Sequence, residues 1–218
     1  NVDHVYCVTM PQRRKDIMKK LNKLNINVTY FDAVKPSDLN PEDYNVLSTT
    51  NIPGTNMYRK MTKLPVHLSY TMCFIDALEK GYDTFIIFED DIIIDADKNT
   101  IINSIEEFKS SPFVMFYMGF CYLKKQQDFN KEEFKYIMDV PDKYLFCNHS
   151  IVFKKEYIPE LLDFIYPMTN FTDDMFKDFF IEKNYNICIP QSDVPYFNQD
   201  RQTIKSLNEN PQELKIYY

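Results

Sequence analysis

The chain opens on a pattern that alternates between strand and helix. Residues 4–10 are a short run of apolar, β-branched and aromatic side chains that stops at Pro11, which is typical of a buried strand. Residues 13–25 then place apolar side chains at helical spacing, and residues 27–34 return to a strand pattern. A strand, a helix and a strand so close together form a βαβ unit, which predicts a parallel sheet.

The alternation continues along the chain. Gly81 directly follows a helical pattern and is predicted to end that helix, because glycine readily adopts the left-handed conformation of a C-cap. Further helices are predicted over residues 63–80, 97–109, 160–165 and 172–183, and further strands over residues 84–88, 113–120, 143–153 and 186–189. We find no repeat and no linker, so the pattern predicts a single α/β domain with a mainly parallel central sheet flanked by helices.

Two segments lie outside this alternation. In residues 35–62, proline and glycine interrupt a polar sequence with little periodicity. A connection this long inside a compact domain is usually functional, and we expect it to be a mobile lid over a bound ligand. Residues 191–218 are polar, and we expect them to drape irregularly over the sheet.

Composition and charge exclude several classes of protein. The 218 residues include 44% hydrophobic and 16% aromatic side chains, which is enough to fill a core and excludes intrinsic disorder. A formal net charge of −7 argues against a nucleic-acid-binding protein, whose surface would carry a basic stripe. No run approaches the ~20 apolar residues that cross a bilayer, so no membrane span is predicted.

The cysteines indicate a reducing compartment. All five are dispersed, with no C-x-x-C pair (Cys7, Cys73, Cys121, Cys147 and Cys188). An odd and scattered set predicts buried thiols rather than a disulfide framework or a zinc site. We therefore expect a cytoplasmic protein, and the scarcity of glycine, with only 3, fits an AT-rich source genome.

The strongest chemical signal is the acidic triplet Glu89-Asp90-Asp91, directly after an apolar strand. In an open parallel sheet, ligands bind outside the carboxyl ends of the strands. Residues two apart in an extended segment point the same way, so Glu89 and Asp91 are placed to share a divalent cation. Hard oxygen ligands favour Mn²⁺ or Mg²⁺. The alternative is a solvated acidic turn in which an aspartate caps the next element.

The order of these elements resembles glycosyltransferase family 25, the lipooligosaccharide type, which has a GT-A (Rossmann-like) fold. The resemblance rests on four stretches that cover most of residues 2–180: residues 5–21, 28–34, 64–92, and 147–165 together with 171–176. The most specific stretch joins a helix to the apolar strand and its E-D-D motif. The chain departs from the family where Ser69-Tyr70 replaces a Ser-His pair and Pro65-Val66 replaces Gly-Cys.

The resemblance implies a glycosyltransferase that uses a nucleotide-sugar donor, a UDP-sugar, and a glycan or glycoprotein acceptor. Mn²⁺ or Mg²⁺ would bridge the diphosphate to Asp91 as main ligand and to Glu89. Residues expected at the nucleotide are Thr9, Arg13, Arg14, Asp32, Lys63 and Asp90. Residues 1–120 would form the nucleotide-sugar-binding half and residues 121–218 the acceptor half and tail. For the two arginines the alternative is a solvated helix start, and for Asp32 it is a turn cap.

The reaction also needs a base to deprotonate the acceptor hydroxyl. Asp173 and Asp174 are the catalytic candidates, although aspartate is favoured at a helix start for capping alone. The family resemblance selects Asp173 as the base of an inverting displacement. His149 is expected to be a core histidine, and Arg201 is placed to close over the leaving group.

Two other functions compete with this interpretation. The first is a GT-A-like domain without activity that acts as a binding or structural module, which the loss of the Ser-His pair favours and the intact triplet opposes. The second is a Mg²⁺-dependent phosphohydrolase. That class needs a nucleophilic aspartate after an early strand, where this chain has Thr9-Met10.

Overall fold

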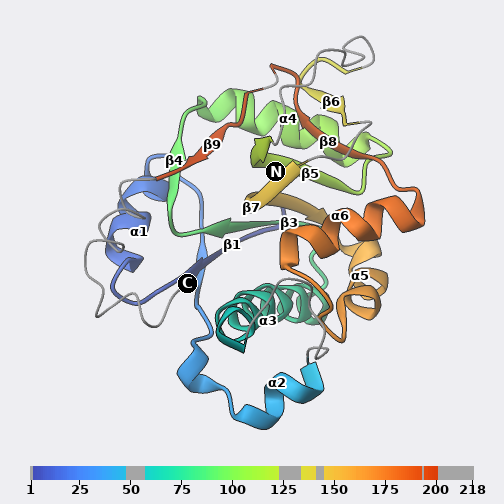
Figure 1. Cartoon of the computed structure of the whole chain (residues 1–218). Helices are drawn as coiled ribbons and strands as arrows, with labels where there is room; N and C mark the ends of the chain where they lie inside the picture. Colours follow the sequence, from blue (N-terminus) through green and yellow to red (C-terminus); the bar gives the residue numbers. More distant parts are fainter. Residues whose placement is uncertain (1, 48–56, 123–133, 141–144, 193, 201–218) are drawn as a thin grey trace.

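The computed structural model describes residues 2–47, 57–122, 134–140, 145–192 and 194–200 (Figure 1). Its helices are α1 (Arg14–Asn22), α2 (Pro41–Leu47), α3 (Met57–Lys80), α4 (Lys98–Ser110), α5 (Ile158–Ile165) and α6 (Thr172–Lys183), with 3₁₀ turns at Pro36–Asp38 and Lys155–Tyr157. Its strands are β1 (His4–Thr9), β2 (Thr29–Asp32), β3 (Thr84–Glu89), β4 (Ile92–Ile94), β5 (Met115–Tyr122), β6 (Ile137–Asp139), β7 (Leu145–Lys154), β8 (Ile187–Pro190) and β9 (Phe197–Gln199).

The main sheet has seven strands in the order β2-β1-β3-β7-β5-β8-β6. Strands β1, β2 and β3 are mutually parallel, and β8 is parallel to β5. Strand β7 is antiparallel to both β3 and β5, and β6 is antiparallel to β8. Five of the seven strands therefore run in one direction, which confirms the predicted α/β fold with a mainly parallel sheet.

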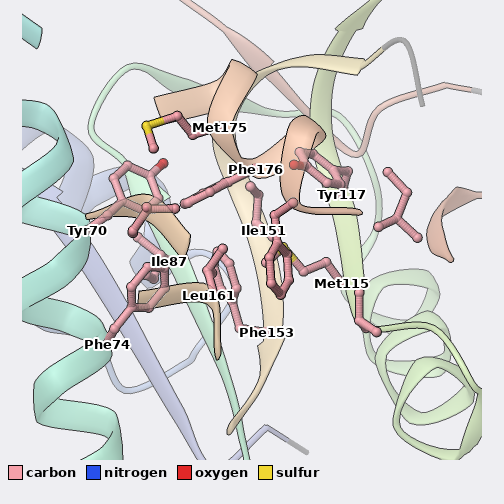
Figure 2. Packing of buried hydrophobic residues seen from close by; sticks show 14 of the residues in the cluster. Tyr70, Phe74, Ile87, Met115, Tyr117, Ile151, Phe153, Leu161, Met175 and Phe176 are labelled. Atoms are coloured by element: carbon pink, nitrogen blue, oxygen red, sulfur yellow. The ribbon is translucent and has the colours of Figure 1, made fainter. Parts of the chain in front are cut away.

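Helices cover both faces of this sheet because successive strand residues point to opposite sides. In β3, Phe85 and Ile87 belong to the core beneath α3, α5 and α6, whereas Ile86 and Phe88 belong to the core beneath α1 and α4. The first core is strongly aromatic (Figure 2). Within it, the ring centroid of Phe153 lies 5.0 Å from that of Phe74 and 6.1 Å from that of Phe176.

The segment 35–62 differs from the expected long loop. It contains a 3₁₀ turn and α2, and α3 begins at Met57 instead of residue 63. The predicted helix therefore starts six residues late, and Pro65 lies inside α3, as the predicted range of 63–80 already implied. Residues 48–56 lie outside the described part, so the lid stays a prediction. Gly81 has a φ of +73° and ends α3 as predicted.

The sequence did not predict three short strands, β4, β6 and β9. Strand β4 follows the acidic triplet, and β9 in the supposedly irregular tail pairs with it in antiparallel register, Ile93 opposite Asn198. This pairing joins segments about a hundred residues apart, and local hydrophobic patterns carry no information on such partners. It brings Asp200 to the end of the triplet, where its backbone N–H donates to the carbonyl oxygen of Asp91 over 2.5 Å.

None of the described helices is both long enough and apolar enough to cross a membrane.

His67, buried on α3, ties this helix to α5 and α6. Its Nε2 lies 3.2 Å from the carbonyl oxygen of Ile165, so Nε2–H donates, and its Nδ1 lies 3.2 Å from the hydroxyl of Thr172. The ring of Tyr166 packs edge-on against the imidazole. Burial lowers the pKa of His67 from 6.5 to about 4, partly offset by the hydrogen bond to Ile165.

We therefore expect His67 to destabilise the fold in acid. A lowered folded-state pKa means that the unfolded chain binds the proton first, so stability is complete above pH 6.5 and falls towards pH 4. The loss should approach roughly 3 kcal/mol. Chemical unfolding of the wild type and His67→Gln at pH 7, 5.5 and 4 measures it, because the variant lacks this titration. Parallel stability curves for the two proteins would contradict the assignment.

Candidate functional site

The acidic triplet lies at the carboxyl end of β3, at the point where the order of the strands reverses. The connection from β1 to β2 runs through α1 on one face, and the connection from β2 to β3 runs through α3 on the other. The chain therefore switches direction between the neighbouring strands β1 and β3, and ligands of α/β sheets bind at the carboxyl ends of strands at such a point. Glu89 ends β3 there, and Asp90 and Asp91 form the turn to β4.

Asp90 fastens the end of β3 to the turn after β1. One carboxylate oxygen accepts the Thr9 hydroxyl at 3.1 Å and the backbone N–H of Met10 at 2.9 Å. The other accepts Arg13 Nη1 at 2.6 Å, and only 8% of the Asp90 side chain is exposed. Thr9, Arg13 and Asp90, all expected at the nucleotide, thus form one network at the switch point.

Glu89 points to the α3 side and meets a residue that sequence reasoning set aside. The hydroxyl of Tyr70 lies 3.2 Å from Glu89 Oε1 and donates to the carbonyl oxygen of Asn148. A phenol has one proton for these two acceptors, so a protonated Glu89 completes the pattern by donating to Tyr70. Burial, followed by the negative charge of Asp91, raises the pKa of Glu89 to about 8.

Asp91 is equally withdrawn from water. The residue is 9% exposed, and its Oδ1 is buried with no hydrogen-bond partner among the described residues. Burial is the main cause that raises its pKa, opposed by the positive charges of Arg13 and Lys20. These facts contradict the alternative of a solvated acidic turn, because Asp91 is buried and the side chain of Asp90 nearly so.

Asp173, in the first turn of α6, belongs to the same group of acidic residues. Its negative charge contributes to raising the pKa values of Glu89, Tyr117 and Cys147, so its carboxylate lies near all three. The N-cap of α6 is Phe171, and no side chain caps it. Asp173 Oδ1 instead accepts the backbone N–H of Asp174 at 3.2 Å.

Asp174 differs from its neighbour because it has a cationic partner. Its carboxylate forms an ion pair with Lys177 Nζ at 2.7 Å, one turn further along α6. Lys63 lies close to this helix start, with its ammonium 5.4 Å from the centre of the Phe171 ring. It sits within α3 rather than just before it, since the helix begins at Met57.

The remaining predicted residues lie further out. Arg14 Nη2 pairs with Asp32 Oδ1 at 2.7 Å at the carboxyl end of β2, and the Asp32 side chain is 64% exposed. This pair stands beside the Asp90 network, since Arg13 and Arg14 are adjacent. Arg201 lies outside the described residues. His149 is buried, as expected of a core histidine.

A divalent cation fits this arrangement. The charges of Asp91 and Asp173 both act on the buried Glu89, and burial opposes the ionisation of Glu89 and Asp91. The buried Oδ1 of Asp91 offers a lone pair that no described residue uses. Hard oxygen donors of this kind match Mn²⁺ or Mg²⁺, whose charge would offset the repulsion.

Sequence reasoning missed the contact of Tyr70 with Glu89. The available signal was its place in the chain, because the family resemblance puts a histidine there. The tyrosine fills that place with a hydroxyl that contacts Glu89, while its ring packs 6.0 Å from that of Phe176 (Figure 2).

We expect Tyr70→Phe to weaken metal binding more than folding. The variant keeps the buried ring but leaves Glu89 and the Asn148 carbonyl without the hydroxyl. Loss of a group that orients a ligand typically lowers metal affinity by ~10–100-fold, whereas a hydrogen bond contributes about 1 kcal/mol to stability. Mn²⁺ titration followed by electron paramagnetic resonance, with thermal unfolding in parallel, tests this. Unchanged Mn²⁺ affinity in a folded variant would remove Tyr70 from the site.

One comparison with known proteins identifies the family. The model of glycosyltransferase family 25 (LPS biosynthesis protein) matches residues 7–208. No curated protein sequence matches the chain. Similar solved structures include A197 from STIV, with 13% identity over 88% of this chain and 81% of that one and a TM-score of 0.47. A glycosyltransferase involved in glycosylation of the major capsid of PBCV-1 shows 12% identity over 72% of this chain and 61% of that one, with a TM-score of 0.37.

The family match spans both the acidic triplet and the start of α6, and therefore all the candidate residues from Thr9 to Asp173. The chain belongs to glycosyltransferase family 25 and is a glycosyltransferase.

Proposed function

We propose that this glycosyltransferase is metal-dependent and transfers a sugar from a UDP-sugar to a hydroxyl of a glycan or protein acceptor, with inversion at the sugar carbon. The observation that carries the proposal is that the buried Glu89 feels the charges of both Asp91 and Asp173, while Asp91 Oδ1 stays buried without a described partner. Such a cluster is suited to a cation and an anionic donor together.

Asp91 and Glu89 would hold Mn²⁺ or Mg²⁺, with Tyr70 fixing Glu89 in place. When bound, the ion supplies positive charge for the diphosphate that departs from the sugar. The protein carries a formal net charge of −7, so any basic side chains that also neutralise the diphosphate must be concentrated at the site.

The nucleotide would lie over the carboxyl ends of β1 and β2. Arg13 is held by Asp90 and is 22% exposed, so it presents donors in a fixed place. The Arg14–Asp32 pair is more exposed and offers both a cation and a hydroxyl acceptor to the ribose or base. The donor would thus be bound by residues 1–120, and the acceptor by residues 121–218, which contribute α6.

Asp173 would take the proton of the acceptor hydroxyl. Its carboxylate lies near Glu89, and no cation forms an ion pair with it among the described residues, whereas Asp174 is bound to Lys177. In an inverting displacement the acceptor oxygen attacks the sugar carbon as the bond to the diphosphate breaks, and the proton passes to the base. Lys63, near the start of α6, is placed to meet negative charge on the same side.

A donor screen tests the function. The full chain is incubated with UDP-, GDP- and CMP-sugars in Mn²⁺, Mg²⁺ or EDTA, and release of nucleotide and of inorganic phosphate is measured. We expect nucleoside diphosphate release from a UDP-sugar that requires the metal and persists in Glu79→Gln, a variant of an exposed acid on α3. Release of inorganic phosphate without sugar transfer would favour a phosphohydrolase. Donor binding without turnover would favour an inactive binding module.

A further inference from the structure

Two cysteines and a histidine from the neighbouring strands β5 and β7 come together close to Glu89 and Asp173. Strand β5 ends near Cys121, and β7, antiparallel to it, begins near Cys147, so both thiols lie at the same edge of the sheet. Their sulfur atoms are 2.6 Å apart, and one ligand atom of His149 lies within 4.8 Å of both. We call these three residues the thiol–imidazole cluster. Cys121 and Cys147 are half-buried and adjacent, contrary to the expectation of dispersed, buried thiols, whereas Cys7, Cys73 and Cys188 are buried as expected.

His149 is oriented so that one ring nitrogen is left for a ligand. Its Nε2 lies 2.8 Å from the carbonyl oxygen of Phe197, an acceptor, so Nε2 carries the proton and donates it. In this tautomer Nδ1 has a lone pair. The residue is 1% exposed, and Nδ1 is buried with no hydrogen-bond partner among the described residues.

The backbone is shaped to allow this orientation. A Cβ atom on Gly119, which pairs with Ser150 across the sheet, would lie 2.4 Å from His149 Cδ2 and 2.6 Å from its Nε2. The register of β5 and β7 shifts on either side of Gly119, and Cys147 has a φ of +68°, which is uncommon for a residue with a side chain. A bulge of this kind re-aims side chains at a site.

We propose that Cys121, Cys147 and His149 Nδ1 bind one zinc ion, at a site separate from the carboxylates of the acidic triplet. Two thiolates and an imidazole are a ligand set that zinc prefers, with solvent or a further ligand completing a tetrahedron. A histidine that binds zinc typically donates its other N–H to a backbone carbonyl, as His149 does to Phe197. Because zinc-bound thiolates lie about 3.7 Å apart, the two sulfurs separate by ~1 Å on binding.

The surroundings favour a cation at this place. The negative charge of Asp173, and that of Glu89 when it is ionised, act on Cys147, so the cluster borders the acidic residues described above. The backbone carbonyl oxygen of Asn148, which lies between Cys147 and His149 in the chain, accepts a hydrogen bond from the Tyr70 hydroxyl. The two sites differ in ligand chemistry, because sulfur and imidazole select zinc whereas carboxylates select Mn²⁺ or Mg²⁺. The zinc proposal therefore stands without the proposed reaction.

Cobalt substitution tests the site independently of activity. The full chain, reduced and freed of metal, is titrated with Co²⁺ and then Zn²⁺ while the ultraviolet and visible absorption is recorded. We expect one equivalent of Co²⁺ to give sulfur-to-cobalt charge-transfer bands and tetrahedral ligand-field bands that one equivalent of Zn²⁺ abolishes. Cys147→Ser and His149→Gln should each weaken binding by ~100-fold or more, beyond the loss typical of an outer residue.

Two controls separate this site from the rest of the molecule. Cys73→Ser removes a buried thiol of α3 outside the cluster, and Asp91→Asn alters the acidic triplet, so both should keep the full cobalt spectrum. Gly119→Ala should weaken binding by displacing His149 while all three ligands remain.

The outcomes are decisive in either direction. Circular dichroism first establishes that each variant is folded. Reduced protein that gives no charge-transfer band overturns the proposal, as does a band that survives unchanged in folded His149→Gln. If mass spectrometry of protein purified without reductant shows a Cys121–Cys147 disulfide and the reduced form binds no zinc, the cluster is a redox pair and the zinc assignment is wrong.

Discussion

Replacing Asp173 by asparagine should lower sugar transfer by ~10²–10⁴-fold, the contribution typical of a general base. Asparagine has nearly the same shape and keeps an oxygen that can accept the backbone N–H of Asp174, but it cannot take the proton of the acceptor. Because no side chain caps α6, the free energy of unfolding should change by less than ~1 kcal/mol. Donor binding should be kept, because the proposed metal ligands belong to β3 and the turn that follows it.

Asp174→Asn is the matched control. It makes the same chemical change one residue away, in a carboxylate that is paired with Lys177 rather than directed at Glu89. Initial rates of transfer, with thermal unfolding of each variant, compare the two. If Asp174→Asn loses activity and Asp173→Asn keeps it, the two roles are exchanged. If both variants keep full activity, α6 does not supply the base.

The second large effect is expected at Asp91. Asp91→Asn removes the charge of the main proposed metal ligand while keeping its size. If the metal stabilises the departing diphosphate by several kcal/mol, transfer at a fixed Mn²⁺ concentration should fall by ~10³-fold or more. The variant should unfold at a temperature equal to or above that of the wild type, since it removes a buried charge next to Glu89 and Asp90.

Its control is Asp95→Asn, a change in an exposed acid just beyond β4. Rates measured over a range of Mn²⁺ concentrations distinguish weakened metal binding from a lost chemical step, because only the former is rescued by more metal. Wild-type rates in Asp91→Asn at every Mn²⁺ concentration would exclude Asp91 as a ligand.

The parts of this structure with strong local patterns were predictable from sequence. The apolar run of β3, the helical spacing of apolar residues in α6 and Gly81 at the end of α3 are all local signals. All three features lie where expected. Burial, followed by the charge of Asp91, raises the pKa of Glu89, so these two acids lie close together, whereas a cation shared between them stays a prediction.

Contacts between distant segments were not predictable. Three Ile residues after the triplet are consistent with several elements, and only pairing with β9 makes them a strand. The same holds for the thiol–imidazole cluster, since the antiparallel pairing of β5 with β7 decides that Cys121 meets Cys147. The sequence identified Tyr70 as a departure from the family pattern, but its contact with Glu89 depends on how α3 packs on the sheet.

The most direct test of the account is the calorimetric binding of UDP with and without Mn²⁺. The central claim is that Asp91 and Glu89 hold a metal that completes the nucleotide site. We expect UDP to bind the wild type tightly in Mn²⁺, with affinity lowered by ~100-fold or more when EDTA is added or in Asp91→Asn, as befits a lost metal ligand. Asp95→Asn should bind UDP like the wild type. Equal UDP affinity in Mn²⁺ and in EDTA, unchanged by Asp91→Asn, would contradict the account.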